Sequence, residues 1–343
     1  MSEGSSRDRA GAPARPLRIG LAYDLKEDYL AAGYSALDVM EFDDEEVIAA
    51  LAKAMAELGY AVERLGRGVE VARRLVAGQR WDLVVSIAEG LKGRCREAQV
   101  PALCELFDQP YAFSDPLTCA ATLDKAVAKR IVRDHALPTA PFAVLRGPED
   151  VTQLEALPLP LFLKPLAEGS SKGITGGSLV HSRHEAAQRC RELLAALGQP
   201  VLAEQFLPGR EVTVGVVGNG PGMRVVGAME VIFTERAELP AYTTVNKAEY
   251  ETRVEYRLVA GDAFAEQARG LALAVARALE CRDVARVDLR ADEHGVLHFL
   301  EVNPLPGLHP VRSDLPILAR LAGVEYRELV GEILAAARQR YGL

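Results

Sequence analysis

Two acids, an amide and an arginine alternate along two short apolar segments in the last quarter of the chain. Arg286 and Asp288 lie two residues apart in the first segment, and Glu301 and Asn303 lie two residues apart in the second. Because alternate side chains of a strand share a face, pairing of the segments would gather Asp288, Glu301 and Asn303. Such oxygen ligands suit Mg²⁺, and Arg286 would face the same site to stabilise charge on a reacting oxygen.

A solvated sheet face with ordinary ion pairs is the alternative interpretation of these side chains. It leaves Glu301 unexplained, because this glutamate follows Phe299 and Leu300 and precedes Val302. A carboxylate in a largely buried strand is costly unless it is paired or binds a metal ion. The two segments therefore favour a metal site.

A loop rich in glycine, serine and lysine at residues 163–173 is a candidate phosphate-binding segment. Small residues such as Ser170 and Ser171 let backbone N–H groups approach phosphate oxygens, and Lys164 supplies positive charge. The spacing of a Walker A loop is missing, and the segment leads into a predicted strand instead of a helix. A surface hairpin with a mobile tip remains the alternative.

The first third of the chain alternates apolar strand patterns with helical patterns. Strands are expected at residues 17–23, 61–65 and 82–87, and helices at 43–58 and through 71–76. The longer helix has one apolar stripe, acidic residues in its first turn and a glycine after its end. This alternation predicts a parallel sheet covered by helices.

The remainder predicts two α+β units. The first is expected to contain a helix at 123–135, strands at 142–145, 159–164, 174–180 and 201–205, and a helix at 185–197. The second is expected to contain strands at 212–217, 223–232, 284–290 and 296–302, a helix at 263–279 and a closing helix after Glu325. The expected divisions are a disordered tail at 1–16 and domains at 17–114, 115–204 and 205–343.

Composition excludes several classes of protein. The 343 residues carry a formal net charge of −8, which argues against a basic nucleic-acid-binding surface. Five widely spaced cysteines without a CxxC pair fit reduced thiols in a cytoplasmic protein. No run of 18 apolar residues indicates a membrane helix, and residues 1–16 lack the apolar core of a secretory signal.

Three separated motifs, taken together, resemble the D-alanine:D-alanine ligase branch of the ATP-grasp superfamily. They lie at residues 164–173, at 201–211 and at 286–307, in the order that the family shows. The resemblance implies a three-domain ATP-grasp architecture, with an N-terminal parallel-sheet α/β domain, a small central α+β lid domain and a C-terminal α+β catalytic domain with an antiparallel sheet. ATP would lie between the antiparallel sheets of the last two domains.

The resemblance also implies roles for individual residues. The lysines Lys125, Lys164 and Lys247 would contact phosphates, and Ser170 and Ser171 would lie in the loop that closes over them. Glu204 and Leu207 look like the adenine-side hinge, and Glu211 looks like the ribose-binding acid. The full set implied for ATP is Lys125, Lys164, Glu168, Ser170, Ser171, Glu204, Gln205, Phe206, Leu207, Glu211 and Lys247.

For catalysis, Arg286 matches the oxyanion-stabilising arginine and Gly307 the glycine whose backbone faces the oxyanion. Asp288, Glu301 and Asn303 match the ligands of two Mg²⁺ ions, for which Mn²⁺ is a possible substitute. The implied catalytic set is Arg286, Gly307, Ser170 and Lys247. Family habit further implies a homodimer formed through the N-terminal domain.

The motifs that set D-alanine specificity in the family are missing. A Glu-Arg-Glu-Val-Ser turn is replaced by residues 24–29, and a His-Gly-x-x-Gly-Glu-Asp-Gly loop by residues 89–97. The Ser-Leu pair that faces the second substrate's carboxylate is represented by Arg312 and Ser313. We interpret Arg94, Arg96 and Arg312 as candidates for binding substrate carboxylates, and Glu89 and Glu97 as candidates for binding a substrate amine. Solvated surface side chains are the alternative for each.

These observations predict an ATP-dependent ligase that joins a small carboxylate to an amino-acid-like amine through an acyl phosphate. Its substrates are expected to differ from two D-alanines. One alternative is a true D-alanine:D-alanine ligase of cell-wall synthesis, and a second is a non-catalytic ATP-binding protein. No nucleic acid or membrane partner is expected.

Overall fold

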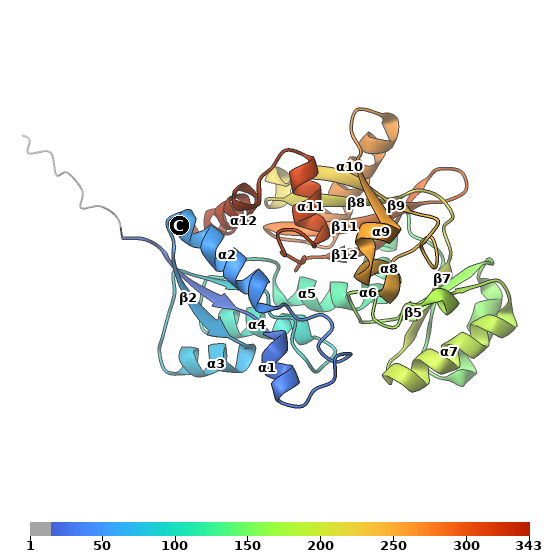
Figure 1. The fold of residues 1–343 in the computed structure, drawn as a ribbon, viewed down its shortest axis with the longest axis horizontal. Helices are drawn as coiled ribbons and strands as arrows, with labels where there is room; N and C mark the ends of the chain where they lie inside the picture. The colour runs from blue at the N-terminus through green and yellow to red at the C-terminus, as the bar shows by residue number, and fades with distance from the viewer. Residues whose placement is uncertain (1–14) are drawn as a thin grey trace, which may run out of the picture.

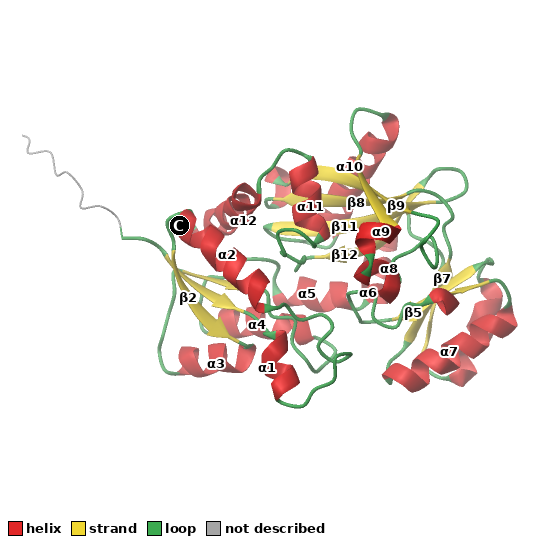
Figure 2. Cartoon of the chain, in the orientation of Figure 1, coloured by secondary structure: helices red, strands yellow, loops and turns green. Residues whose placement is uncertain are grey.

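Three β-sheets organise the chain in the computed structural model, which describes residues 15–343. They contain three, five and four strands, and helices pack against each of them (Figures 1 and 2). The predicted tail at 1–16 lies, except for its last two residues, outside the described part of the chain. No helix within residues 15–343 is long and apolar enough to cross a membrane.

The N-terminal sheet is parallel, as the sequence predicted. Its order is β2 (Ala61–Gly66), β1 (Arg18–Ala22) and β3 (Leu83–Ser86). Helix α2 (Glu45–Glu57) begins at Asp44, whose side chain accepts a hydrogen bond from the backbone N–H of Val47. The other helices of this part are α1 (Lys26–Ala31), α3 (Gly68–Val76), the 3₁₀ turn η1 (Arg96–Ala98), α4 (Gln99–Leu106) and α5 (Pro116–Leu123).

The central sheet is antiparallel, in the order β4 (Phe142–Leu145), β7 (Val201–Gln205), β5 (Leu161–Pro165) and β6 (Leu179–Val180). Helix α7 (Arg183–Leu197) covers it at the right of Figure 1, and the 3₁₀ segment η2 (Pro148–Ala156) packs beside it. The strand predicted at 174–180 is wrong for most of its length. Only its last two residues pair, because Thr175 and Ser178 cap the short 3₁₀ turn η3 (Gly176–Ser178).

The C-terminal sheet is antiparallel and has five strands. Their order is β10 (Val254–Leu258), β9 (Arg224–Phe233), β8 (Glu211–Val217), β11 (Val284–Ala291) and β12 (Leu297–Asn303). The helices of this part are α8 (Thr244–Ala248), α9 (Tyr250–Arg253), α10 (Ala263–Ala278), α11 (Asp314–Leu321) and α12 (Tyr326–Tyr341), with a 3₁₀ turn η4 (Gly220–Gly222). Helix α6 (Lys125–Asp134) also packs against β12.

Helix α11 lies close to the C-terminal sheet because two paired glycines leave room for it. Gly215 of β8 faces Gly227 of β9 in the register of the two strands. A Cβ atom added at Gly215 would come within 2.7 Å of the Leu315 side chain. The glycine pair therefore sets the position at which α11 begins, and with it the loop from β12 to α11.

The observed architecture confirms the predicted fold class, with one parallel and two antiparallel sheets. The domain boundaries after residues 114 and 204 stay predictions. Strand β7 extends to Gln205 and β8 begins at Glu211, so the connection between the central and C-terminal sheets lies at 206–210. Seven helices and strands had no sequence signal that we recognised: α1, α4, α5, α8, α9, β10 and α11.

Candidate active site

A cavity of about 490 Å³ lies where segments attached to all three sheets meet. Of the predicted site residues, those that line it are Glu89, Glu97, Lys125, Lys164, Glu168, Ser170, Ser171, Glu204, Gln205, Phe206, Leu207, Glu211, Lys247, Arg286, Asp288, Glu301, Asn303, Gly307, Arg312 and Ser313. Arg94 and Arg96 do not line it. Residues that are separated by up to 224 positions in sequence, from Glu89 to Ser313, thus share one enclosed space.

The four polar side chains of the two C-terminal segments meet as the strand pattern predicted. Strands β11 and β12 pair antiparallel, with Asp288 opposite Glu301 and Arg286 opposite Asn303. The Asn303 amide donates a hydrogen bond of 3.3 Å to Asp288, and the Arg286 guanidinium donates one of 2.9 Å to the same carboxylate. The predicted pairing and shared face are therefore confirmed.

The surroundings of the two carboxylates shift their pKa values in opposite directions. Burial opposes ionisation of Glu301, yet the positive charges of Lys125 and Lys164 lower its pKa to about 2. Burial raises the pKa of Asp288, and the nearby Glu301 adds to that effect while Arg286 opposes it. The buried Asp288 carboxylate and the half-buried Glu301 carboxylate, together with an amide oxygen, fit a divalent cation, because a hard cation would neutralise the charge that burial disfavours.

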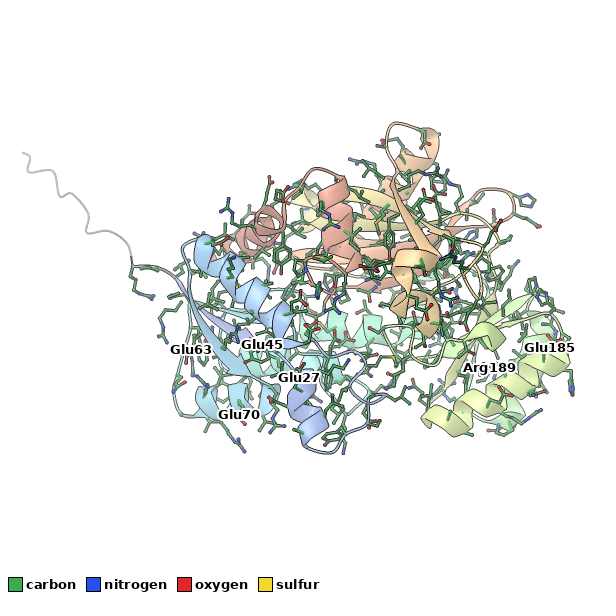
Figure 3. All side chains as sticks on the ribbon, in the orientation of Figure 1. Glu27, Glu45, Glu63, Glu70, Glu185 and Arg189 are labelled. Atoms are coloured by element: carbon green, nitrogen blue, oxygen red, sulfur yellow. The ribbon has the colours of Figure 1, made fainter. Side chains whose placement is uncertain are left out.

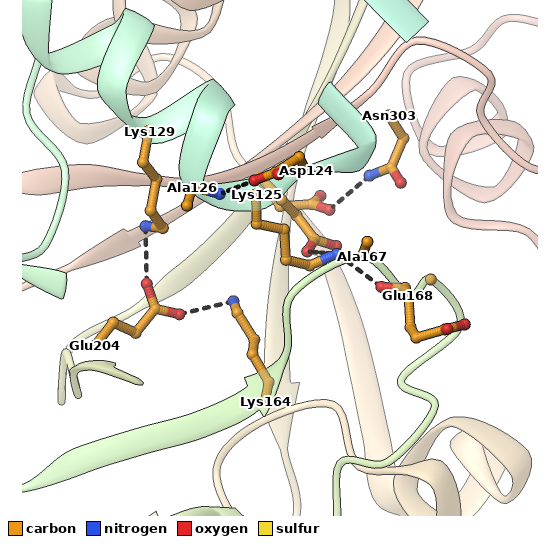
Figure 4. Close-up of polar contacts among 12 residues, drawn as sticks. Asp124, Lys125, Ala126, Lys129, Lys164, Ala167, Glu168, Glu204 and Asn303 are labelled. Carbon is orange, nitrogen blue, oxygen red and sulfur yellow. Dashed lines mark hydrogen bonds and ion pairs between the residues drawn. The ribbon is translucent and has the colours of Figure 1, made fainter. Parts of the chain in front are cut away.

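A chain of buried ion pairs lies along the part of the cavity wall that Lys164 and Glu204 form (Figure 4). The Glu204 carboxylate lies between two lysines, with 2.8 Å to the Lys129 ammonium and 2.7 Å to that of Lys164. Burial opposes ionisation of Glu204, but the two lysines lower its pKa to about 2. Lys129 is fully buried and also donates to the Phe299 carbonyl oxygen at 3.1 Å. The sequence interpretation missed Lys129, although it lies one helical turn after Lys125.

The glycine-rich loop contributes residues 168–171 to the lining of the cavity. The Lys125 ammonium donates a hydrogen bond of 2.7 Å to the Glu168 carbonyl oxygen (Figure 4). The same ammonium lies 3.3 Å from the Glu301 carboxylate. Ser170 and Ser171 have positive φ angles of 46° and 59°. Residues other than glycine rarely adopt this left-handed conformation unless the surrounding structure holds them in it.

Glu211 and Lys247 approach the cavity from the C-terminal sheet and from helix α8. The Arg290 guanidinium donates a hydrogen bond of 2.7 Å to Glu211 and lies 4.8 Å from the ring centre of Phe206. Burial raises the pKa of Glu211 to about 7, with Arg290 acting against it. Burial lowers the pKa of Lys247, and the negative charge of Asp314 opposes that shift.

The wall formed by the N-terminal part of the chain is acidic. Asp43, Glu89 and Glu97 line the cavity, and within residues 15–343 their carboxylates have no hydrogen-bond or ion-pair partner. Burial raises the pKa of both Asp43 and Glu97 to about 7. Burial and the neighbouring Glu97 raise the pKa of Glu89 well above its usual value. These groups differ from exposed carboxylates such as Glu45 on the outer surface of the same domain (Figure 3).

Two of the arginines predicted to bind a substrate carboxylate are occupied elsewhere. Arg94 projects from the surface, with 74% of its side chain exposed, and donates a 2.7 Å hydrogen bond to Asp124. Arg96 is buried, and its guanidinium donates 2.9 Å and 3.0 Å hydrogen bonds to Glu41 and to the Ala167 carbonyl oxygen. Neither guanidinium lines the cavity, so we correct both assignments. The sequence prediction failed for Arg94 and Arg96 because their carboxylate partners, Asp124 and Glu41, lie far from them in sequence.

Arg312 and Ser313 do line the cavity. The Arg312 guanidinium donates a 2.7 Å hydrogen bond to Asp44, and Ser313 Oγ accepts one of 3.1 Å from the His309 backbone N–H. A Cβ atom added at Gly307 would lie 2.8 Å from Ser313 Oγ, so glycine is needed at this position.

Comparison with known proteins agrees with this geometry. Residues 131–335 match the family model described as D-ala D-ala ligase C-terminus. The chain belongs to the D-alanine–D-alanine ligase family. It is therefore an ATP-grasp ligase that forms a carbon–nitrogen bond with the use of ATP, which confirms the predicted reaction class.

Individual relatives and solved structures match over most of the chain. The D-alanine–D-alanine ligase of Aquifex aeolicus is 30% identical over 290 residues, which are 83% of this chain and 92% of that protein. The uncharacterized protein y4sG of Sinorhizobium fredii is 33% identical over 269 residues, which are 76% of this chain and 75% of that protein. The ATP-complexed D-alanine–D-alanine ligase structure from Bacillus anthracis has a TM-score of 0.71 at 21% identity, covering 95% of this chain and 99% of that one.

Proposed function

We propose that this enzyme joins a carboxylate to an amine through an acyl phosphate, with substrates other than two D-alanines. The observation that carries the proposal is the meeting of two different walls in one cavity. One wall has the lysines and the acid–amide cluster suited to ATP and a divalent cation. The other has the carboxylates of Asp43, Glu89 and Glu97, for which the described residues 15–343 provide no hydrogen-bond or ion-pair partner.

The triphosphate is held by positive charge from three directions. Lys125 reaches the cavity from α6, Lys164 from β5 and Lys247 from α8. The backbone of the loop with Glu168, Ser170 and Ser171 supplies N–H groups to the phosphate oxygens. The adenosine part is bounded by Glu204, Gln205, Phe206, Leu207 and Glu211, all of which line the cavity. Since two lysines engage the Glu204 carboxylate, backbone groups of 205–207 recognise the base.

Asp288, Glu301 and Asn303 would hold two Mg²⁺ ions, or Mn²⁺ in their place. Divalent cations bound there would neutralise the negative charge of the phosphates and polarise the transferring phosphoryl group. The fit rests on the oxygen-rich donor set and on the burial of the Asp288 carboxylate, which is only 8% exposed.

The chemistry has two steps. A carboxylate oxygen of the first substrate attacks the γ-phosphorus of ATP, the bond to ADP breaks, and an acyl phosphate forms. The amine of the second substrate then attacks the acyl carbon, phosphate leaves with the bonding electrons, and the nitrogen loses a proton. Lys247 and Ser170 contact the transferring phosphoryl group in the first step. In the second, Arg286 and the backbone N–H of Gly307 hold the oxyanion.

Substrate selection is assigned to the acidic wall and to the loop before α11. Glu89 and Glu97 bind an ammonium group of a substrate, because their carboxylates face the cavity without a partner in residues 15–343. Arg312 and Ser313, at the start of α11, are placed to contact the carboxylate of an amino-acid-like amine. Arg312 would have to exchange its bond with Asp44 to do so.

Phosphate and ADP release across a panel of D- and L-amino acids tests the proposal. We expect ADP formation that requires both an acid and an amine, and that is faster with at least one pair other than two D-alanines. Strong turnover with D-alanine alone would instead establish a D-alanine–D-alanine ligase, the activity named for the Aquifex aeolicus relative. Binding of ATP without turnover on any pair would favour a non-catalytic ATP-binding protein.

We further propose a cytoplasmic homodimer that assembles through the N-terminal domain, by analogy with the family. Light scattering of the purified chain tests the assembly: a mass of twice 37.1 kDa is expected, and a monomer would contradict it. Fractionation of cells that express the protein tests the location, with recovery in the cytoplasmic fraction as the expected result.

A further inference from the structure

Arg96 and Glu41 form a clamp on the glycine-rich loop. The Arg96 guanidinium donates a hydrogen bond of 3.0 Å to the carbonyl oxygen of Ala167. One Glu41 oxygen accepts a 2.9 Å hydrogen bond from Arg96, and the other accepts from the backbone N–H of Gly169. The pair thus binds a backbone acceptor and a backbone donor that lie two residues apart.

The two sides of this clamp come from different parts of the fold. Arg96 opens the 3₁₀ turn η1 and Glu41 precedes α2, so both belong to the part of the chain with the parallel sheet. The loop residues Ala167 and Gly169 follow β5 of the central sheet. Both clamp side chains are only 10% exposed, which makes this ion pair much less screened than one at the surface.

Glu168 lies between the two clamped residues, and it connects the clamp to the cluster that contains Glu301. Its carbonyl oxygen accepts the hydrogen bond from Lys125 (Figure 4). The Lys125 ammonium also lies 3.3 Å from Glu301. Its carboxylate lies 3.1 Å from Lys172 and 3.6 Å from Arg96. A shift of the loop would therefore move the Glu168 carbonyl oxygen away from Lys125. It would thereby disturb the lysine that neighbours Glu301, a proposed metal ligand.

The clamp also supports a costly backbone conformation. The left-handed residues Ser170 and Ser171 directly follow Gly169, and such residues keep this conformation only when contacts around them enforce it. On their far side, Thr244 Oγ1 donates a 2.9 Å hydrogen bond to the Ser171 carbonyl oxygen. The loop is thus fastened at both ends of its left-handed pair.

We propose that Arg96 and Glu41 are positioning residues that hold the glycine-rich loop closed over the phosphates of ATP. By doing so they couple loop closure to the domain whose wall carries Glu89 and Glu97. This inference rests on the proposed nucleotide site, and it replaces the predicted role of Arg96 in substrate binding. Glu41 had no assigned role in the sequence interpretation.

Trypsin cleavage after Lys172 reports loop opening without any requirement for turnover. The Lys172 side chain is 14% exposed in the closed loop, so cleavage needs the loop to open. The rate of the 172/173 cut is measured by mass spectrometry in the intact protein, with and without a non-hydrolysable ATP analogue. Variants are Arg96→Gln, Arg96→Lys and Glu41→Gln, and the matched control is Arg73→Gln, an exposed arginine paired only with Glu70.

We expect Arg96→Gln and Glu41→Gln each to speed this cut about 10-fold, the loss associated with a charged hydrogen bond. The KM for ATP should rise by a similar factor, with a smaller change in kcat. Arg96→Lys should recover part of the normal cleavage rate and part of the normal KM. Arg73→Gln should match the unaltered chain in both quantities. The double variant should be no worse than the worse single variant, because both belong to one clamp.

An unchanged cutting rate and an unchanged KM for ATP in either Gln variant would overturn the inference. A fall in melting temperature with both quantities unchanged would also overturn it, since that result indicates a purely structural ion pair. If Arg96→Gln does not fold, Gly169→Ala takes its place, because the added Cβ would come within 3.2 Å of the Glu41 carboxylate and disturb the same contact. Failure of the proposed nucleotide site is distinguishable, because no ATP analogue would then protect the loop of the unaltered chain.

Discussion

Asp288 and Glu301 face each other across the β11–β12 pair, and two positions along the same strands Arg286 lies opposite Asn303. The four side chains share one face of the C-terminal sheet beneath the cavity. This register brings the proposed metal ligands together with Arg286, the arginine that we propose to stabilise the oxyanion. It also brings the Arg286 guanidinium within 3.3 Å of Asp314, at the start of α11.

Replacement of Arg286 by Gln should reduce kcat by about 10² to 10³, the usual effect of losing one oxyanion donor. Measurement of kcat and KM for ATP separates the causes, because KM should change much less than kcat. Arg282→Gln is a suitable control, since Arg282 pairs with Asp115 and does not line the cavity. An Arg286→Gln enzyme with a normal kcat would remove the residue from the chemistry.

Replacement of Lys129 by Met should lower the free energy of unfolding by about 3–5 kcal/mol. Lys129 is fully buried, and its removal leaves the buried Glu204 carboxylate with Lys164 as its single ammonium partner. Urea unfolding measures the effect. Lys53→Met on the surface of α2 should stay within about 1 kcal/mol, because Lys53 has only a 3.9 Å contact with Glu57. Equal stability of the two variants would contradict this assignment.

The affinity for an ammonium-bearing substrate should increase as pH rises through about 7, where Asp43 and Glu97 lose their protons. The groups acting on Glu97 are Arg96 and Lys125, which favour its ionisation, and Glu41, which opposes it. The measurement is KM for that substrate between pH 6 and pH 8, which should fall. Glu97→Gln should flatten the profile, and a pH-independent KM in the unaltered enzyme would be the contrary result.

The same groups predict the sign of the pH effect on stability. The pKa values of Asp43 and Glu97 are higher in the folded protein than in the unfolded chain, where a glutamate has a pKa of about 4.3. The folded state therefore binds more protons between these values, and their contribution to the unfolding free energy falls as pH rises from about 4 to about 7. Glu97→Gln should reduce that fall in thermal unfolding experiments, and an unaltered slope would contradict the raised pKa of Glu97.

Replacement of Gly307 by Ala should reduce kcat about 10-fold, because the new Cβ would meet Ser313 Oγ and displace the backbone N–H that we propose to face the oxyanion. Gly270→Ala is the matched control. Gly270 lies in α10 with no atom within 4 Å of an added Cβ, so alanine there should stabilise the helix by up to about 1 kcal/mol and leave kcat unchanged. Equal kcat values for the two variants would contradict the role of Gly307.

Local patterns in the sequence were sufficient for much of the fold and for the centre of the site. Strand periodicity placed Asp288, Glu301 and Asn303 on one face, and the observed register agrees, because two short strands joined by a tight turn have few other ways to pair. The helix around Val47 was predicted from its apolar stripe and acidic first turn, and the structure has α2 there. Such elements depend on neighbours within one turn or one hairpin.

What could not be predicted depends on contacts between distant segments. Arg96 has the residue type of a carboxylate-binding side chain, but its partners Glu41 and Ala167 lie 55 and 71 positions away. The buried Lys129 showed no local signal of its importance, because its burial comes from β12 and from Glu204 of β7. Strand β10 was missed because its outward side chains are exposed and its pairing is decided by β9.

The most direct measurement is Mg²⁺-dependent ADP formation by the Asp288→Asn, Glu301→Gln double variant, with nucleotide binding measured in parallel by calorimetry. The account predicts that ADP formation with the best acid–amine pair falls at least about 100-fold, while the fold and the melting temperature are retained. ADP formation at the rate of the unaltered enzyme would contradict the claim that these two carboxylates hold the cations that grip ATP.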